Sequence, residues 1–136
     1  MSGAWFLDRL TTAPGTPALV VHDGLVKKGS VPPYVVVYLA VLSPSALLEP
    51  QKISLETAYD MTDVSAYCHC VGVDADAARS VAARVSARLL GVVPQIAGRD
   101  CTPVWHDDGQ PPTRDETTGV PVFDQVDVYR FQSYPA

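Results

Sequence analysis

The cysteines and histidines of this sequence are the residue types with the most specific potential chemistry. Cys68, His69 and Cys70 are consecutive, and thiolates and imidazoles are good zinc ligands. If this stretch is a strand, Cys68 and Cys70 share one face and His69 points to the other, so the three cannot bind one ion. Cys101 and His106 would complete a ligand set only by folding beside them. We therefore interpret the cysteines as free thiols that pack as small apolar side chains.

His106, Asp107 and Asp108 form a second candidate, either a base with an orienting carboxylate or part of a site for a hard metal ion. Neighbours in a loop seldom make such a pair, and no nucleophile stands in a Gly-x-Ser-x-Gly turn. The stretch is interpreted as a solvated acidic loop. A small metal-binding protein that uses the three cysteines and His106 stays open as an alternative.

The basic residues do not form a cluster that would bind a phosphate backbone. Arg79, Arg84 and Arg88 fall on one expected helix, where a solvated face is the commoner explanation than a site for an acidic partner. No Gly-x-Gly-x-x-Gly or Gly-x4-Gly-Lys-Ser/Thr phosphate loop occurs. Ten Lys and Arg against fifteen Asp and Glu give a formal charge of −5, which disfavours tight binding to nucleic acid.

The length of 136 residues fits a single domain over residues 1–136. Three cysteines fit no disulfide framework, which favours a reducing compartment. No apolar run approaches the ~20 residues of a membrane-spanning helix, so no membrane partner is expected. The N-terminus lacks the basic start and apolar stretch of a secretory signal.

One long helix, from Asp74 to Leu90, is the best-defined element. Asp74 is suited to the N-cap, and Gly91 is suited to a left-handed C-cap. An apolar stripe runs along one side of the helix; it consists of Ala78, Val81, Ala82, Val85 and Leu89. A shorter helix is expected over residues 3–12.

The remaining elements are expected to be strands. Residues 34–42 are apolar on both faces, which predicts a central strand covered on both sides. In the strand over residues 64–73, Val64, Ala66, Cys68 and Cys70 share one face. Further expectations are a hairpin of 18–22 with 25–27, strands over 53–58, 100–106 and 120–131, and a polar loop over 107–119.

The order of these elements predicts an α+β fold: a mostly antiparallel sheet packed by the long helix Asp74–Leu90 and the short N-terminal helix. A polar loop of about a dozen residues and exposed sheet edges point to a protein partner, with a homo-oligomer as the simplest one.

The sequence from Tyr34 to Phe131 resembles the tail terminator (tail-completion, minor tail) proteins of long-tailed bacteriophages, especially those of actinobacteria. The resemblance is one of order and texture and covers most of the chain. Its parts are Tyr34-Val-Val-Val-Tyr-Leu, Tyr67-Cys-His-Cys-Val-Gly-Val-Asp-Ala-Asp-Ala-Ala-Arg, Val85-Ser-Ala-Arg-Leu-Leu-Gly91, Ala97-Gly-Arg-Asp-Cys-Thr-Pro-Val104 and Phe123-Asp-Gln-Val-Asp-Val-Tyr-Arg-Phe131.

The resemblance implies a structural virion protein without catalytic residues, cofactor or metal. Such proteins form a hexameric ring that caps the head-proximal end of the tail tube and stops its polymerisation. The ring then joins the head-completion (connector) proteins, and DNA passes through its lumen without tight binding. The implied location is the virion tail, assembled in the cytoplasm of the bacterial host.

The resemblance also implies where contacts lie. The polar loop, with Asp107, Asp108, Arg114, Asp115 and Glu116, is expected on a ring face or in the lumen, where it would contact tube or connector. Tyr129 and Phe131 are expected near a subunit contact. Two alternatives stay open: another head–tail connector or head-closure protein, and a ligand-binding module with a pocket between the long helix and the sheet.

Overall fold

The computed structural model describes residues 4–12, 19–26, 29–42, 61–116 and 121–135. The described residues form an α+β fold, as expected from the sequence, with two helices and seven strands. In chain order these are α1 (Ala4–Thr12), β1 (Val21–Asp23), β2 (Tyr34–Leu42), β3 (Thr62–Gly72), α3 (Ala75–Leu89), β4 (Arg99–Cys101), β5 (Trp105–Gly109), β6 (Thr113–Asp115) and β7 (Val122–Pro135). None of these helices is long and apolar enough to cross a membrane.

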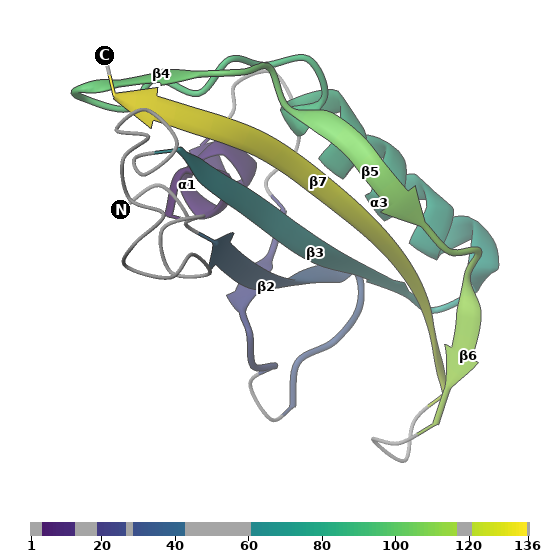
Figure 1. Ribbon diagram of the computed structural model, residues 1–136. Coiled ribbons are helices and arrows are strands. Elements are labelled where there is room, and N and C mark those ends of the chain that lie inside the picture. Colours follow the sequence, from purple (N-terminus) through teal and green to yellow (C-terminus); the bar gives the residue numbers. More distant parts are fainter. Residues whose placement is uncertain (1–3, 13–18, 27–28, 43–60, 117–120, 136) are drawn as a thin grey trace.

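The strands form one mixed sheet in the order β1-β2-β3-β7-β4, with β5 and β6 also paired to β7. All pairs are antiparallel except β1–β2, which is parallel. This confirms the expectation of a mostly antiparallel sheet. The long strand β7 is the common partner of β3, β4, β5 and β6, so it organises that side of the molecule (Figure 1).

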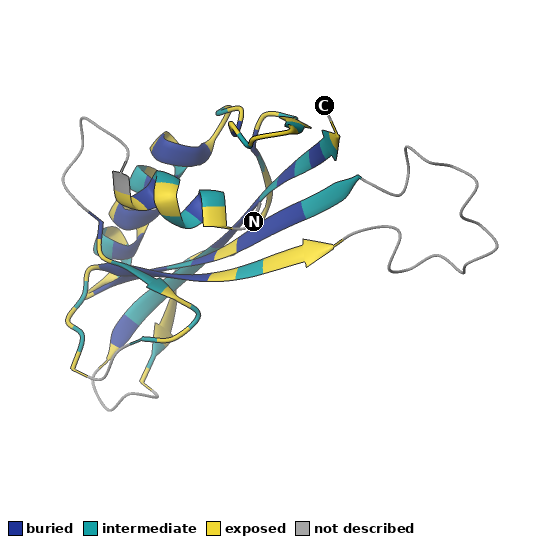
Figure 2. Ribbon diagram, turned by 90° about the vertical axis from the view of Figure 1, so that its left-hand side faces the viewer, coloured by how far each residue is buried: buried dark blue, intermediate teal, exposed yellow. Residues whose placement is uncertain are grey.

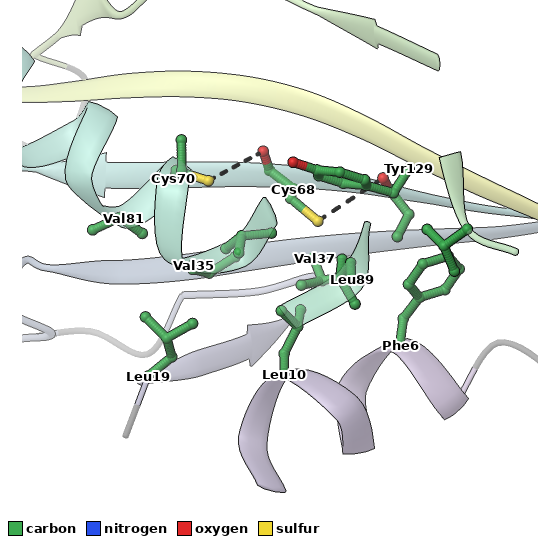
Figure 3. Close-up of a cluster of buried hydrophobic side chains, with 14 of the residues drawn as sticks. Phe6, Leu10, Leu19, Val35, Val37, Cys68, Cys70, Val81, Leu89 and Tyr129 are labelled. Carbon is green, nitrogen blue, oxygen red and sulfur yellow. Dashed lines mark hydrogen bonds between the residues drawn. The ribbon is translucent and has the colours of Figure 1, made fainter. Parts of the chain in front are cut away.

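Both helices lie on the same side of the sheet (Figure 2). The main core lies between the two helices and the sheet. It combines residues of α1 and α3 with the helix-facing residues of β2, β3 and β7. Phe6 and Leu10 of α1 reach this core together with Cys68 and Cys70 of β3 (Figure 3). The face alternation expected for β3 is therefore confirmed, since Val64, Ala66, Cys68 and Cys70 are all fully buried.

The long helix α3 begins and ends as its sequence predicts. The Asp74 carboxylate accepts a hydrogen bond from the Ala77 amide at 2.7 Å, and Gly91 adopts a left-handed φ of 77°. All five residues of the expected apolar stripe are buried. Arg88 is buried as well, which contradicts the expectation that it belongs to a solvated face.

The expected strand 100–106 and polar loop 107–119 are wrong in their boundaries. The chain forms β4 and then β5, which extends through Asp107 and Asp108, and β6 covers Thr113–Asp115. The physical reason is the length of β7, whose edge offers backbone groups that these polar residues pair with. A register shift between His106 and Asp108 accommodates the acidic residues in β5.

The expected N-terminal hairpin is also wrong. Strand β1 pairs in parallel with Val35–Val37 of β2, and Leu25 and Val26 after the Asp23-Gly24 turn are not in a strand. Strand β2 is longer than a local hairpin arm would be, so it is the better pairing partner for β1. The strand expected over 53–58 lies outside the described residues.

Strand β2 has the predicted bounds, but the prediction that both faces are covered holds for only part of it. Its first four residues are buried, whereas Tyr38, Val41 and Leu42 are 47%, 49% and 45% exposed. Figure 2 shows this exposed half of β2 extending beyond the helices. The helices are too short to cover the whole length of the strand.

Candidate functional site

Cys68 and Cys70 lie where the strand pattern places them, and burial makes both thiols poorly reactive. Cys68 and Cys70 are enclosed in the core, where each thiol reaches only a backbone carbonyl of its own strand (Figure 3). Burial is the main cause that raises the pKa of the Cys68 thiol to about 12, with a smaller contribution from Asp127. Burial raises the pKa of Cys70 even further. Within the described ranges, no group of three His, Cys, Asp or Glu is arranged to hold a metal ion.

His69 points away from the cysteines, as alternation predicts, and pairs with a residue from a distant part of the sequence. Its Nδ1 lies 2.8 Å from Oδ2 of Asp124 on β7, and its ring stands edge-on to Tyr38. The hydrogen bond to Asp124 is the main cause that raises the pKa of His69, against an opposing effect of burial. This pair joins β3 to β7 on the sheet face opposite the helices.

His106 also pairs with a carboxylate, although not with Asp107 or Asp108. Its Nε2 lies 3.0 Å from Oδ1 of Asp127, a 10% exposed side chain on β7 that also accepts a hydrogen bond from Gln125. Gly109 leaves room for this pair, since a Cβ there would approach Asp127 Oδ1 to 2.7 Å. The pair fastens edge strand β5 to β7.

In the part of the chain that the structure describes, the side chains opposite this histidine–aspartate pair are not activated nucleophiles. Two candidates lie directly opposite the pair on neighbouring strands, Cys68 opposite Asp127 and Tyr129 opposite His106, and burial raises the pKa of each to about 12. Both therefore remain protonated at neutral pH, and a thiol or phenol in that state is a poor nucleophile. The geometry supports a cross-strand staple rather than a catalytic dyad.

The five charged residues expected to make contacts lie together along one side of the molecule, on and just after β5 and β6 (Figure 1). We call this surface the charged edge; it consists of Asp107, Asp108, Arg114, Asp115 and Glu116. Asp107 lies 3.2 Å from the Arg130 guanidinium, and Arg114 lies 2.6 Å from Glu116. Most of the charged edge is thus carried by strands β5 and β6, where the sequence predicts a loop.

Tyr129 and Phe131 do not lie on the surface. They are 1% and 0% exposed and belong to the main core, where Phe131 packs against the rings of Trp5 and Phe6. These two residues face the helices because the residues opposite them on β3 are Ala66 and Val64, which face the core. Their side chains stabilise the fold and are not available to a neighbouring subunit.

Arg79 and Arg88, two of the three arginines of α3, have different roles. Arg79 is exposed and pairs with Asp76 one turn earlier. Arg88 instead donates a 2.5 Å hydrogen bond to the Leu10 carbonyl, and its own carbonyl accepts one from Arg9 at 2.8 Å. Arg88 therefore joins the N-terminal helix to α3 and is not part of an exposed binding site for an acidic partner.

An exposed apolar surface that the sequence analysis does not predict lies toward the edge of the sheet away from β5 and β6. It follows the outer edge of β2 over residues 38–42, and Tyr67 on β3 continues it across the open face. We call residues 38–42 the apolar edge. Its signal in the sequence is Tyr-Leu-Ala-Val-Leu, a strand segment without a charge. An apolar segment of this kind also fits a strand that is covered on both faces, which is what the sequence predicts here.

No family model matches the chain, and no curated protein matches it. A comparison with solved structures finds a protein chain described as "Virion of native gene transfer agent (GTA) particle", with a TM-score of 0.62 and 17% sequence identity. The alignment covers 85% of this chain and 78% of that chain. This protein shares its fold with a chain of the gene transfer agent virion.

The similarity to the gene transfer agent chain extends over most of the fold rather than over one motif. The alignment covers more than three quarters of both chains, so it includes most of the sheet and its helices. At 17% identity the likeness establishes the fold and does not transfer individual side chains.

Proposed function

We propose that this protein is a structural component of a phage-like particle and acts as a tail terminator. The observation that supports the proposal is the fold shared with the gene transfer agent virion chain. The resemblance to tail terminators is carried by the sequence and gives separate support. The described residues hold no group of three potential metal ligands, and the proposal concerns assembly rather than chemistry.

The mechanism of a terminator is geometric. A ring of subunits covers the polymerising end of the tube, so that the next ring of tube protein finds no surface to add to. Its far side then receives the connector of the head. A subunit of such a ring needs a rigid sheet and distinct surfaces for distinct partners.

The charged edge is the surface that we assign to the tube or the connector. Its side chains are exposed or half-buried. The pairs His106–Asp127 and Asp107–Arg130 fasten β5 to β7, and β6 pairs with β7 through its backbone. Charged groups on a rigid edge favour orientation and partner choice more than raw affinity. The formal charge of −5 also suits a lumen that lets DNA pass without tight binding.

The test is electron microscopy of the purified full chain mixed with tail tubes. We expect six-fold rings at one end of each tube and an arrest of further tube growth. Binding to capsids, with tubes left bare, would favour a connector or head-closure role instead. A protein that ignores both tubes and capsids would contradict the proposal.

A charge-reversal variant tests the assigned surface. Asp108→Lys combined with Glu116→Lys should reduce binding to tube ends by roughly tenfold or more, as loss of charge complementarity at an interface does. The circular dichroism spectrum should be unchanged. Asp8→Lys, which changes an exposed acid on α1, is the matched control and should bind like the wild type. Equal binding of all three proteins would remove the charged edge from the proposal.

A further inference from the structure

Among the residues that the structure describes, the outer edge of β2 is only partly paired. Strand β1 pairs with Val35–Val37 and then ends, and the chain leaves the edge at Gly24. Within the described residues, no other strand of the sheet pairs with the outer side of residues 38–42. On its inner side this segment is fully paired with β3, through Leu42 opposite Asp63.

The direction of the unpaired backbone groups follows from the hydrogen bonds to β1. The Val35 amide donates to the Val20 carbonyl at 2.9 Å, and the Val37 carbonyl accepts from Gly24 at 2.8 Å. Odd-numbered residues of β2 therefore direct their backbone groups outward. Because the direction alternates along a strand, Leu39 and Val41 present their N–H and C=O groups at the open edge.

This edge lacks the features that normally prevent strand addition. Residues 38–42 contain no charge, no proline and no register shift, and Tyr38, Val41 and Leu42 are about half exposed. Strand β5 on the opposite side of the sheet has both a register shift and acidic residues. Natural edge strands use such charges and bulges to block pairing, and a long apolar edge without them accepts another strand.

We propose that the apolar edge pairs with the same edge of a second copy of this chain, antiparallel, about a two-fold axis at Ala40. Leu39 then lies opposite Val41 of the partner subunit, and the two outward-facing residues exchange both backbone hydrogen bonds. The same exchange occurs on the other side of the axis. Two sheets thereby join into one across the β2–β2 seam.

The sequence of the edge fits this occupant in particular. In the proposed register Tyr38 lies opposite Leu42 of the partner subunit, so every cross-strand pair is apolar and no like charges meet. Ala40 lies in the non-hydrogen-bonded position on the axis, where strands approach most closely and a small side chain fits. A chain of net charge −5 repels its copies elsewhere, and an uncharged seam keeps the charges apart. The charged edge could not pair with itself in this way.

The proposed dimer is a state of the free protein, and it does not depend on the proposed function. A two-fold contact is isologous, whereas a ring with six-fold rotation alone is built from head-to-tail contacts. The dimer would therefore separate before ring assembly. Because the tests below use the protein without tubes, their failure is distinguishable from failure of the terminator role.

The first test is sedimentation equilibrium of the full chain over a range of concentrations. We expect a reversible species of twice the 14.6 kDa chain mass. Ala40→Lys should raise the dimer dissociation constant by about fivefold or more, since it places like charges directly opposite each other. Thr113→Lys, on exposed β6, is the matched control and should leave the constant unchanged. A monomer at every concentration, or a hexamer that Ala40→Lys leaves intact, would overturn the proposal.

The second test reports the register itself. In Ala40→Cys the two introduced thiols would face each other across the axis, at a separation that a disulfide can bridge. Mild oxidation should give a covalent dimer, whereas Thr113→Cys and the wild type should stay monomeric on a denaturing gel. Val41→Pro should weaken the dimer and keep the β2–β3 ladder, because the Val41 amide faces outward. Equal crosslinking of Ala40→Cys and Thr113→Cys would rule out the proposed seam.

Discussion

Cys68 and Cys70 show how position on a strand decides the chemistry of a side chain. Both thiols lie on the buried face of β3, and His69 between them faces the other side of the sheet. A zinc ligand must deprotonate, and burial raises the pKa of both thiols. The same three residues in a surface loop would be a credible part of a metal site.

Thiol reactivity tests this assignment. The pKa of Cys68 rises from 9.0 to about 12, so its thiolate population near neutral pH falls about a thousandfold. Iodoacetamide should therefore label half-buried Cys101 in the native protein and leave Cys68 and Cys70 unlabelled until denaturant is added. Mass spectrometry of tryptic peptides measures the difference. Rapid native labelling of Cys68 would contradict its place in the core.

The His69–Asp124 pair leads to a pH-dependent prediction. The pKa of His69 is raised in the folded state, so the pair stabilises the protein fully below the ordinary histidine pKa of 6.5 and loses this effect as pH rises through the folded pKa. His69→Gln should thus cost more stability at pH 5.5 than at pH 8. Since the pair is partly exposed and screened by water, we expect a difference below about 1 kcal/mol.

Urea unfolding of the wild type and His69→Gln at both pH values measures this difference. Asp76→Asn, which changes an exposed helix pair, is the control for general pH effects. A larger loss at pH 8 than at pH 5.5 would mean that the histidine is not stabilised in its charged form.

At the scale of elements, the junction between β3 and α3 depends on a close approach. Gly72 ends β3, and a Cβ at this position would lie 2.4 Å from the Ala78 amide nitrogen and 2.6 Å from the Ala77 carbonyl carbon. These are backbone atoms of the first helical turn, which cannot move without shifting the helix. The glycine lets the strand turn directly under the helix that covers it.

Gly72→Ala should therefore destabilise the protein by about 1–3 kcal/mol, the usual cost of overpacking. Urea unfolding should show a lower midpoint with an unchanged slope. Val73→Ala changes the next residue, which is 63% exposed, and should have little effect. A stability equal to that of the wild type would show that helix and strand are less closely packed than described.

At the scale of the whole molecule, the two helices are joined through a buried arginine. Arg88 donates to the Leu10 carbonyl, seventy-eight residues earlier in the chain, and Arg9 donates back to the Arg88 carbonyl. The pKa of Arg88 is lowered by burial and by its neighbours Arg84 and Arg9, which marks the cost of placing a cation there. The docking of α1 on the core therefore depends on this bond as well as on Phe6 and Leu10.

Arg88→Met keeps the apolar contacts and leaves the Leu10 carbonyl without this donor. We expect a loss of about 1–3 kcal/mol, typical of a buried acceptor that loses its partner. Limited proteolysis should also cleave near α1 faster than in the wild type. Arg79→Met, at an exposed ion pair, should cost less than about 1 kcal/mol. Equal effects of the two substitutions would show that Arg88 does not join the helices.

The two edges of the sheet differ in charge. One edge carries acidic residues on short strands fastened to β7, and the other carries the uncharged outer side of β2. The two proposals assign each edge to a different contact. The charged edge serves orientation on tube or connector, and the apolar edge serves pairing of free copies.

Local sequence signals determined the helix α3, the strand β2, the face alternation of β3 and the α+β class. Each depends on residues within one element: the Asp74 cap, the apolar stripe, the run of β-branched residues and the alternation around Cys68. Backbone geometry enforces these patterns wherever the element is placed, so they could be predicted without the fold.

Only the tertiary structure decided which elements meet. The polar stretch after Trp105 forms edge strands because the long strand β7 offers backbone groups for them to pair with. Strand β1 pairs with the outer edge of β2. The pairs His69–Asp124 and His106–Asp127 join residues 55 and 21 positions apart. Such contacts depend on strand order and register, which no local pattern encodes, and the same reason placed Tyr129 and Phe131 in the core and left half of β2 exposed.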